Sequence, residues 1–140
     1  IEKVMNVQAI ATKPFAEALA AGQVEMVTAE IDKEYLAAAG QYAWPGPRQV
    51  RILYTPLHGV GRNAVVPLLQ QAGFQDVVVY APHAEPSGDF PNVPGHVSNP
   101  ENTIVFDAPI ENAQLIKADL VMATDPDCDR LGVAAPLTTD

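Results

Sequence analysis

The chain has few of the residues on which several classes of protein depend. It contains one cysteine in 140 residues, which excludes an intramolecular disulfide and indicates a reducing, cytoplasmic setting. Only eight Lys and Arg side chains stand against 17 Asp and Glu, and the net charge of −9 argues against a nucleic-acid partner. No apolar run reaches the length of a membrane span, and the N-terminus lacks the pattern of a signal peptide, so we expect no membrane partner.

What the chain does contain is typical of a globular domain. Hydrophobic residues make up 48% of the sequence and charged residues 18%, which favours a folded core over disorder. A chain of this length forms about one domain with a modest core. Thirteen prolines and nine glycines indicate long ordered loops between the elements. Because the sequence begins without Met and ends at Thr-Thr-Asp, we expect it to be a fragment of a longer protein.

Hydrophobic periodicity and helix-terminating residues predict alternating helices and strands. The predicted helices cover residues 14–21, 29–39, 63–71 and 108–117, and the predicted strands cover residues 49–54, 76–80, 118–123 and 131–135. The crossover helix between the first two strands predicts parallel pairing, whereas the tight reversal before the last strand predicts an antiparallel edge. The unbroken apolar run of the second strand predicts burial on both faces. A linker over 41–49 and a long loop over 82–109 complete the pattern.

Three carboxylates, Asp125, Asp127 and Asp129, alternate directly after the third predicted strand. Like charges at this spacing repel one another, unless a divalent cation or surrounding water compensates them. Pro126 makes the segment a stiff loop. Carboxylate oxygens on such a loop can converge on one hard cation, and Mg²⁺ prefers oxygen ligands. Arg130 follows directly and is placed to bind a phosphate that the metal also faces.

The acidic loop has other interpretations. A run of alternating aspartates is also typical of a solvated turn that binds no metal. An EF-hand loop counted from Asp125 would need Gly and Glu where Arg130 and Pro136 stand, so that interpretation fails. A HAD-type phosphatase is a weaker alternative, because its pattern would place Thr or Val at Asp129. The thiolate of Cys128 is disfavoured by its acidic neighbours, which indicates a small filling residue and not a nucleophile.

A second motif, Thr-Pro-Leu-His-Gly-Val-Gly, begins at Thr55 at the end of the first predicted strand. Such a turn before a helix can present backbone N–H groups to an anion, or it can simply permit a tight turn. Gly59 and His58 are therefore candidate phosphate contacts, although His58 can equally position the acidic loop or be a hydrogen-bonded structural residue. Both loops follow the carboxyl ends of strands, where α/β sheets bind ligands, so they can share one face. We expect His83 and His96 to lie on the surface.

Three motifs in order resemble the α-D-phosphohexomutases, the phosphoglucomutase and phosphomannomutase superfamily. Asp-Pro-Asp-Cys-Asp-Arg resembles their metal-binding loop, D-[GP]-D-x-D-R, and the motif at Thr55 resembles another signature of the same domain. The long loop contains Phe-Pro-Asn-Val and Ser-Asn-Pro-Glu, which are similar to the signatures F-P-x-V and P-N-P-E. Ser98 stands where the last signature has its first Pro, and residues 94–97 lie between the two. The resemblance covers roughly residues 28–135.

The resemblance implies a division of the chain and a fold. Residues 1–45 would be the end of domain I with connecting helices, and residues 46–140 would be domain II. That domain is a three-layer α/β/α sandwich with a four-stranded mixed sheet, in which three strands are parallel and one antiparallel strand lies at the edge.

The resemblance also implies a site. Mg²⁺ would be held by Asp125, Asp127 and Asp129, and Arg130 would bind phosphate, with His58 and Gly59 as further candidates. A phosphoserine in another domain of the parent enzyme would exchange its phosphoryl group with a hexose phosphate. The serine loop T-A-S-H-N-P is absent from this sequence, so we expect no catalytic residue here and no turnover by the chain alone. The rival interpretations are a non-catalytic acidic metal-binding module and a HAD-like phosphatase.

Overall fold

A computed structural model describes residues 10–137, and the chain divides into two compact units, Ile1–Lys33 and Glu34–Asp140. In the first unit, helix α2 covers Phe15–Ala20, with Pro14 at its N-cap. Gly22, just past the C-cap, has a φ of 68°, which glycine adopts without strain. The helix predicted over 14–21 is confirmed with its proline start and glycine stop.

Helix α3, Ala29–Gly40, crosses the boundary between the two units and confirms the helix predicted over 29–39. Its apolar residues Ile31 and Tyr35 are 55% and 59% exposed, so they lie in solvent. None of its side chains is buried among the residues that the structure describes. Residues 41–51 then contain turns but no helix or strand, in agreement with the predicted linker.

The second unit is built on one four-stranded sheet with the order β2-β1-β3-β4. The strands are β1 (Ile52–Thr55), β2 (Val77–Val79), β3 (Leu120–Thr124) and β4 (Leu131–Ala134), and the helices are α4 (Arg62–Gln71) and α5 (Asp107–Ile116). Strand β1 pairs in parallel with β2 and β3, and β4 pairs antiparallel with β3 at the edge. This is the predicted α/β fold with a mixed sheet.

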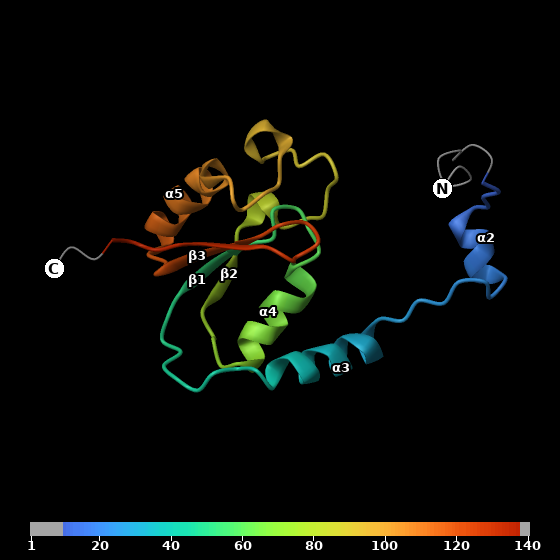
Figure 1. Ribbon diagram of the computed structural model, residues 1–140, viewed down its shortest axis with the longest axis horizontal. Coiled ribbons are helices and arrows are strands. Elements are labelled where there is room, and N and C mark those ends of the chain that lie inside the picture. Colours follow the sequence, from blue (N-terminus) through green and yellow to red (C-terminus); the bar gives the residue numbers. More distant parts are fainter. Residues whose placement is uncertain (1–9, 138–140) are drawn as a thin grey trace. The chain divides into compact units, whose positions relative to one another are not determined.

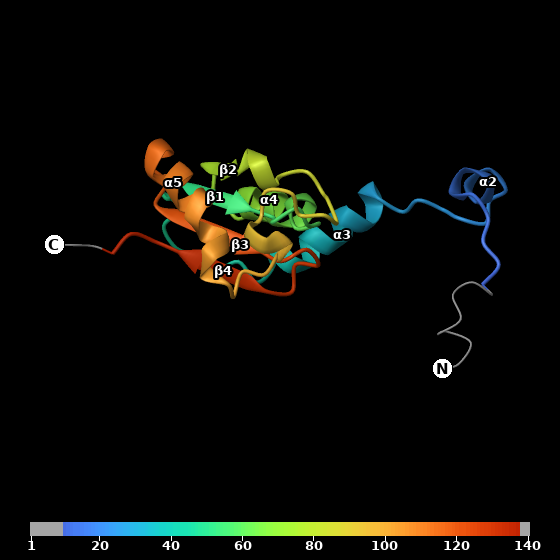
Figure 2. The same ribbon diagram turned by 90° about the horizontal axis from the view of Figure 1, so that it is seen from above.

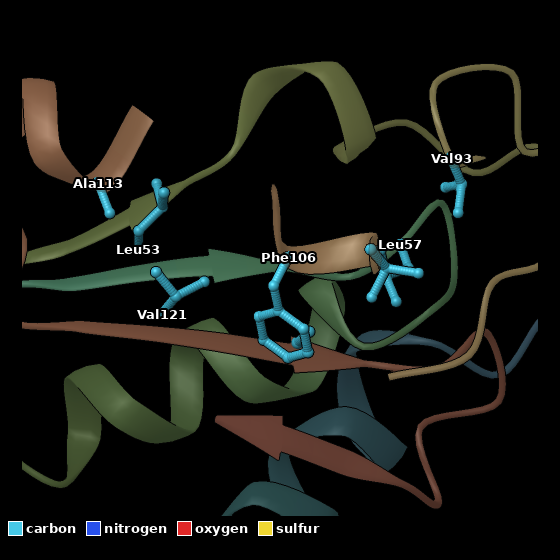
Figure 3. Packing of buried hydrophobic residues seen from close by; sticks show 8 residues of the cluster. Leu53, Leu57, Val93, Phe106, Ala113 and Val121 are labelled. Atoms are coloured by element: carbon cyan, nitrogen blue, oxygen red, sulfur yellow. The ribbon is translucent and has the colours of Figure 1, made fainter. Parts of the chain in front are cut away.

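Helix α5 lies on one side of the sheet and α4 on the other, which gives the three predicted layers (Figures 1 and 2). The main hydrophobic core lies on the α5 side, where Leu53 and Val121 of the sheet face Ala113 of the helix (Figure 3). Phe106 and Leu57 extend this core toward the carboxyl edge of the parallel strands. None of the helices within residues 10–137 has the length and apolar composition needed to cross a membrane.

Two arginines cap the C-termini of α4 and α5, at the edge of the sheet opposite the carboxyl ends of the parallel strands. Nε of Arg48 donates to the carbonyl of Ala72 at 2.7 Å, just past α4, and its guanidinium lies 4.8 Å from the ring centroid of Phe74. A guanidinium nitrogen of Arg51 donates to the carbonyl of Ile116, the last residue of α5, at 2.6 Å. Cations here satisfy carbonyls that have no partner within the helix, and they oppose the negative end of its dipole. These arginines are therefore structural.

The prediction that the second strand is buried on both faces is wrong. In β2 the side chain of Val78 is 38% exposed, and Val77 and Val79 are only half-buried. The strand lies at the edge of the sheet, beside β1 alone. Its apolar run arises from β-branched valines in a short edge strand and not from central burial.

The long loop predicted over 82–109 is ordered by three short 3₁₀ helices and not by a regular element. They are η2 (Ala81–His83), η3 (Pro94–His96) and η4 (Thr103–Phe106). Helix α5 begins at Asp107, directly after η4, so the loop is slightly shorter than predicted. Two of the 3₁₀ helices contain proline in their first turn, which suits a fixed φ in a short turn.

Candidate metal centre

The acidic loop and the turn that begins at Thr55 meet at the carboxyl edge of the parallel strands. Because β1 and β3 are adjacent and parallel, the loops that follow them leave the same edge of the sheet. The backbone N–H of Val60 donates to the carbonyl of Pro126 at 2.9 Å, which joins the two loops directly. The shared face predicted for these loops is therefore present.

The acidic loop brings its three carboxylates together. One oxygen from each of Asp125, Asp127 and Asp129 lies within 4.8 Å of the others. Asp125 is fully buried, whereas Asp127 and Asp129 are exposed. The loop begins at the end of β3 and turns at Cys128, whose φ is 63°. A left-handed residue here reverses the backbone, so that alternate side chains face a common point.

Asp125 is the fixed member of this group. Its Oδ1 accepts the backbone N–H groups of Asp129 at 3.1 Å and Arg130 at 2.9 Å, and its Oδ2 accepts Nε of Arg130 at 2.7 Å. Burial of the side chain opposes ionisation, but the hydrogen bonds from Arg130, with smaller contributions from Asp127 and Asp129, outweigh burial and lower the pKa of Asp125 to about 2. Asp125 is therefore a buried, ionised carboxylate that organises the loop around itself.

Asp129 experiences the opposite electrostatics. Its pKa is raised, first by its side-chain hydrogen bond to Asp125 and then by repulsion from the charges of Asp127 and Asp125. Arg130 is the nearby cation, and its Nε lies 3.6 Å from Asp129. One guanidinium cannot neutralise three carboxylates, so the loop retains excess negative charge that a cation would relieve.

Arg130 is held on one side and open on the other. Its bond to Asp125 fixes Nε, and this carboxylate is the main reason that the pKa of Arg130 is raised. The side chain remains 43% exposed, and a terminal nitrogen lies 4.0 Å from the carboxylate of Glu101. The remaining N–H donors of the guanidinium can therefore bind an anion that approaches the acidic loop.

Two glycines allow the turn after β1 to approach the acidic loop. A Cβ on Gly59 would lie 2.5 Å from the carbonyl oxygen of Pro126, and a Cβ on Gly61 would lie 2.7 Å from Oγ1 of Thr124. The N–H of Gly59 donates to the carbonyl of Pro56 at 2.8 Å, so this group is used within the turn. Gly59 thus acts here by its small size.

The side chains behind this contact are buried and neutral. The hydroxyl of Tyr54 lies 2.8 Å from Oγ1 of Thr124, which joins β1 to β3 behind the acidic loop. Burial raises the pKa of Tyr54 to about 12, so the phenol keeps its proton. Helix α4 begins at Arg62, directly after Gly61, so its positive end lies beside the loop.

His58 is buried in the turn and only 6% exposed. Its Nδ1 lies 2.8 Å from the carbonyl oxygen of Glu85, and this acceptor fixes the proton on Nδ1. Nε2 is buried, and among residues 10–137 it has no hydrogen-bond partner. The residue therefore connects the turn to the long loop and keeps one unpaired acceptor.

The prediction that His83 lies on the surface is wrong, whereas His96 is exposed as expected. His83 is 1% exposed; its Nδ1 lies 2.9 Å from Oγ1 of Thr55, and its Nε2 lies 3.0 Å from the carbonyl oxygen of Asn92. The Nε2–H therefore donates to Asn92, and the hydroxyl of Thr55 donates to Nδ1. No local pattern signals this role, because the partners are distant in the sequence.

The buried His83 makes stability depend on pH. Burial lowers its pKa below 6.5, against the opposing effect of the Asn92 carbonyl and with a smaller contribution from His58. The unfolded chain therefore binds the proton more readily, so stability is full above pH 6.5 and declines as the pH falls below it. Urea unfolding on both sides of pH 6.5 measures this decline, which should shrink in His83→Gln and persist in His96→Gln. An unchanged decline in His83→Gln would contradict this assignment.

The donor set fits a hard divalent cation. Three carboxylates converge; one of them is buried and ionised, and the other two face solvent, where the single guanidinium of Arg130 compensates their charge only in part. Oxygen-only ligands with free positions for water or phosphate suit a hard cation such as Mg²⁺. The fold and this loop define an α/β domain that presents oxygen ligands at the carboxyl edge of a mixed sheet.

Comparison with known proteins identifies the family. Residues 33–137 match the family model described as phosphoglucomutase/phosphomannomutase, alpha/beta/alpha domain II. A phosphoglucomutase of Staphylococcus epidermidis is 34% identical over 79% of the chain, and a probable phosphomannomutase of Haemophilus influenzae is 34% identical over 76%. The chain belongs to the phosphoglucomutase/phosphomannomutase family.

The structural comparison agrees at the level of the fold. A crystal structure of a phosphoglucomutase/phosphomannomutase family protein from Burkholderia thailandensis superposes with a TM-score of 0.63 at 21% identity, over 75% of this chain and 21% of that one. The chain spans about a fifth of the length of the two relatives above, 20% and 22%. The sequence resemblance to the phosphohexomutases is therefore confirmed for the family and for domain II.

Proposed function

We propose that residues 46–140 supply the metal-binding loop of a phosphohexomutase, with residues 1–45 as the end of the preceding domain and its connection. The observation that carries the proposal is the convergence of Asp125, Asp127 and Asp129 beyond β3 in a chain of this family. These aspartates would hold Mg²⁺. When bound there, the ion would neutralise negative charge on a phosphoryl group during its transfer.

The residues of this chain would position and balance charge. Asp125 fixes the loop and orients Arg130 through the bond to Nε. Arg130 would bind the phosphate with its remaining donors, and His58 would hold the turn beside the loop. Phosphoryl transfer depends mainly on such positioning and charge stabilisation, so the loop needs no nucleophile of its own.

The reaction is proposed for the parent enzyme as a whole. A phosphoserine of another domain would pass its phosphoryl group to a hexose 1-phosphate such as glucose or mannose 1-phosphate. The bisphosphorylated sugar would then return the other phosphate to the serine. The names of the relatives support this isomerase chemistry, and the share of their length that the chain spans supports the need for other domains.

A substitution at Asp127 distinguishes the proposed function from the alternatives. In the parent enzyme, Asp127→Asn should lower turnover of glucose 1-phosphate or mannose 1-phosphate by about 10²-fold or more, because the transition state loses electrostatic stabilisation. Glu111→Gln removes an exposed carboxylate on α5 and is the matched control. Coupled mutase assays measure both variants.

The chain alone provides the second half of this test. We expect it to turn over no sugar phosphate, because it lacks the serine loop. Hydrolysis of a simple phosphate ester by the purified chain would instead favour a phosphatase. Full turnover in the Asp127→Asn parent enzyme would favour a module whose acidic loop serves no catalytic role.

A further inference from the structure

The turn that touches the acidic loop is held in an unfavourable backbone conformation. Leu57 and His58, two consecutive residues with side chains, have φ values of 47° and 65°. The left-handed region costs such residues about 1–2 kcal/mol each. A bulky residue persists there only where surrounding contacts impose the conformation. The contacts that impose it therefore control the position of the turn.

Several of those contacts come from one segment of the long loop, residues 83–98, which we name the brace; another joins the N–H of Leu57 to Oγ1 of Thr55 at 3.2 Å. The N–H of His58 donates to the carbonyl of His83 at 3.0 Å, and the N–H of Ser87 donates to the carbonyl of His58 at 3.1 Å. The hydroxyl of Ser98 donates to the carbonyl of Leu57 at 2.8 Å. The brace thus binds the backbone of both left-handed residues.

Ser98 supplies the side-chain hydrogen bond by which the brace holds Leu57. It is 8% exposed, and its acceptor residue, Leu57, is completely buried. A carbonyl buried without its donor costs about 1–3 kcal/mol, so the hydroxyl has a defined role.

The turn transmits its position to the acidic loop. Val60 donates its N–H to the carbonyl of Pro126, and Gly59 leaves no room for a Cβ against Pro126. Pro126 is bonded directly to Asp125, the buried carboxylate around which the loop is arranged. A continuous series of contacts therefore runs from the brace through the turn to the proposed metal ligands.

We propose that Ser98 is a positioning residue, which sets the geometry of the acidic loop by fixing the left-handed turn at Leu57 and His58. The part of this inference that concerns the metal rests on the proposed function. The part that concerns the loop's conformation does not depend on it. The two parts have separate tests in the same variant.

The first test measures amide hydrogen exchange by NMR in the metal-free chain. In Ser98→Ala, exchange of the amides of Val60, Asp129 and Arg130 should accelerate by about tenfold, the size of one net hydrogen bond. Amides of β1 and β3 should exchange as in the unchanged chain. Ser87→Ala is the matched control, because among residues 10–137 the Ser87 hydroxyl accepts only from the N–H of Asp89, at 3.3 Å, and the backbone N–H of Ser87 is retained.

The second test measures Mg²⁺ binding by calorimetry. Ser98→Ala should weaken binding by about 3- to 10-fold while circular dichroism shows a folded chain, and Ser87→Ala should bind normally. Unchanged exchange at Val60, Asp129 and Arg130, or an equal rise throughout β1 and β3, would overturn the proposal. If the unchanged chain binds no Mg²⁺, the proposed function fails, and the exchange measurement alone decides the role of Ser98.

Discussion

Asp125→Asn should destabilise the chain by about 2–4 kcal/mol, the largest loss we expect from a single change at the site. The substitution removes a buried charge that accepts two backbone N–H groups and Nε of Arg130. An amide replaces one acceptor oxygen with a donor, so at least one of these donors loses its partner and meets another N–H group. Urea unfolding followed by circular dichroism measures the loss.

Asp127→Asn is the matched control for that measurement. It makes the same chemical change two residues away, but Asp127 is exposed. Removing its charge relieves repulsion within the loop, so stability should change by less than about 0.5 kcal/mol. Equal destabilisation by the two variants would contradict the assignment of Asp125 as the residue that organises the loop.

The ion pair between Asp125 and Arg130 also makes stability depend on pH in acid. The pKa of Asp125 is about 2 in the folded chain and 3.8 in its ordinary state. Since the folded pKa is the lower one, the contribution of Asp125 is present above pH 3.8 and is lost as the pH falls toward 2. The acid unfolding of Asp125→Asn should lack this component.

Gly59→Ala should displace the acidic loop without altering any charge. The new Cβ would meet the carbonyl carbon of Pro126 at 2.7 Å and its oxygen at 2.5 Å, and both are backbone atoms. Overpacking of this kind costs about 1–3 kcal/mol. Since the atoms that must move adjoin Asp125, Mg²⁺ affinity should fall by about tenfold or more. Calorimetry and urea unfolding measure the two effects.

Gly88→Ala provides the control for that substitution. Among the described residues, no atom other than those of Gly88 and its two chain neighbours lies within 4 Å of a Cβ built on Gly88, and its φ lies outside the left-handed region. This variant should keep both the stability and the Mg²⁺ affinity of the original chain. Normal Mg²⁺ binding by Gly59→Ala would show that close approach of the turn is not needed to form the site.

The sequence was sufficient to predict the elements that place the site. The strand at 49–54 and the strand at 118–123 correspond to β1 and β3, which lie side by side and in parallel. Local signals determine such elements, because apolar runs, prolines and glycines act within a few residues. The convergence of the acidic loop followed from the alternation of its aspartates after a buried strand.

The contacts that hold the site together could not be predicted in this way. His83, Ser98 and the hydroxyl of Tyr54 find partners 28, 41 and 70 residues away in the sequence. No periodicity encodes such pairs, since they depend on how the long loop folds against the turn. The edge position of β2 could not be predicted either, because a run of three valines is equally typical of a central strand and of a short edge strand.

Titration of the chain with Mg²⁺, followed by NMR and calorimetry, tests the central claim most directly. The claim is that Asp125, Asp127 and Asp129 form one cation site beyond β3. It predicts saturable binding of one ion per chain, with shifts concentrated in the amides of residues 125–130 and lost in Asp127→Asn. Shifts scattered over the acidic surface, or no binding at millimolar Mg²⁺, would contradict it.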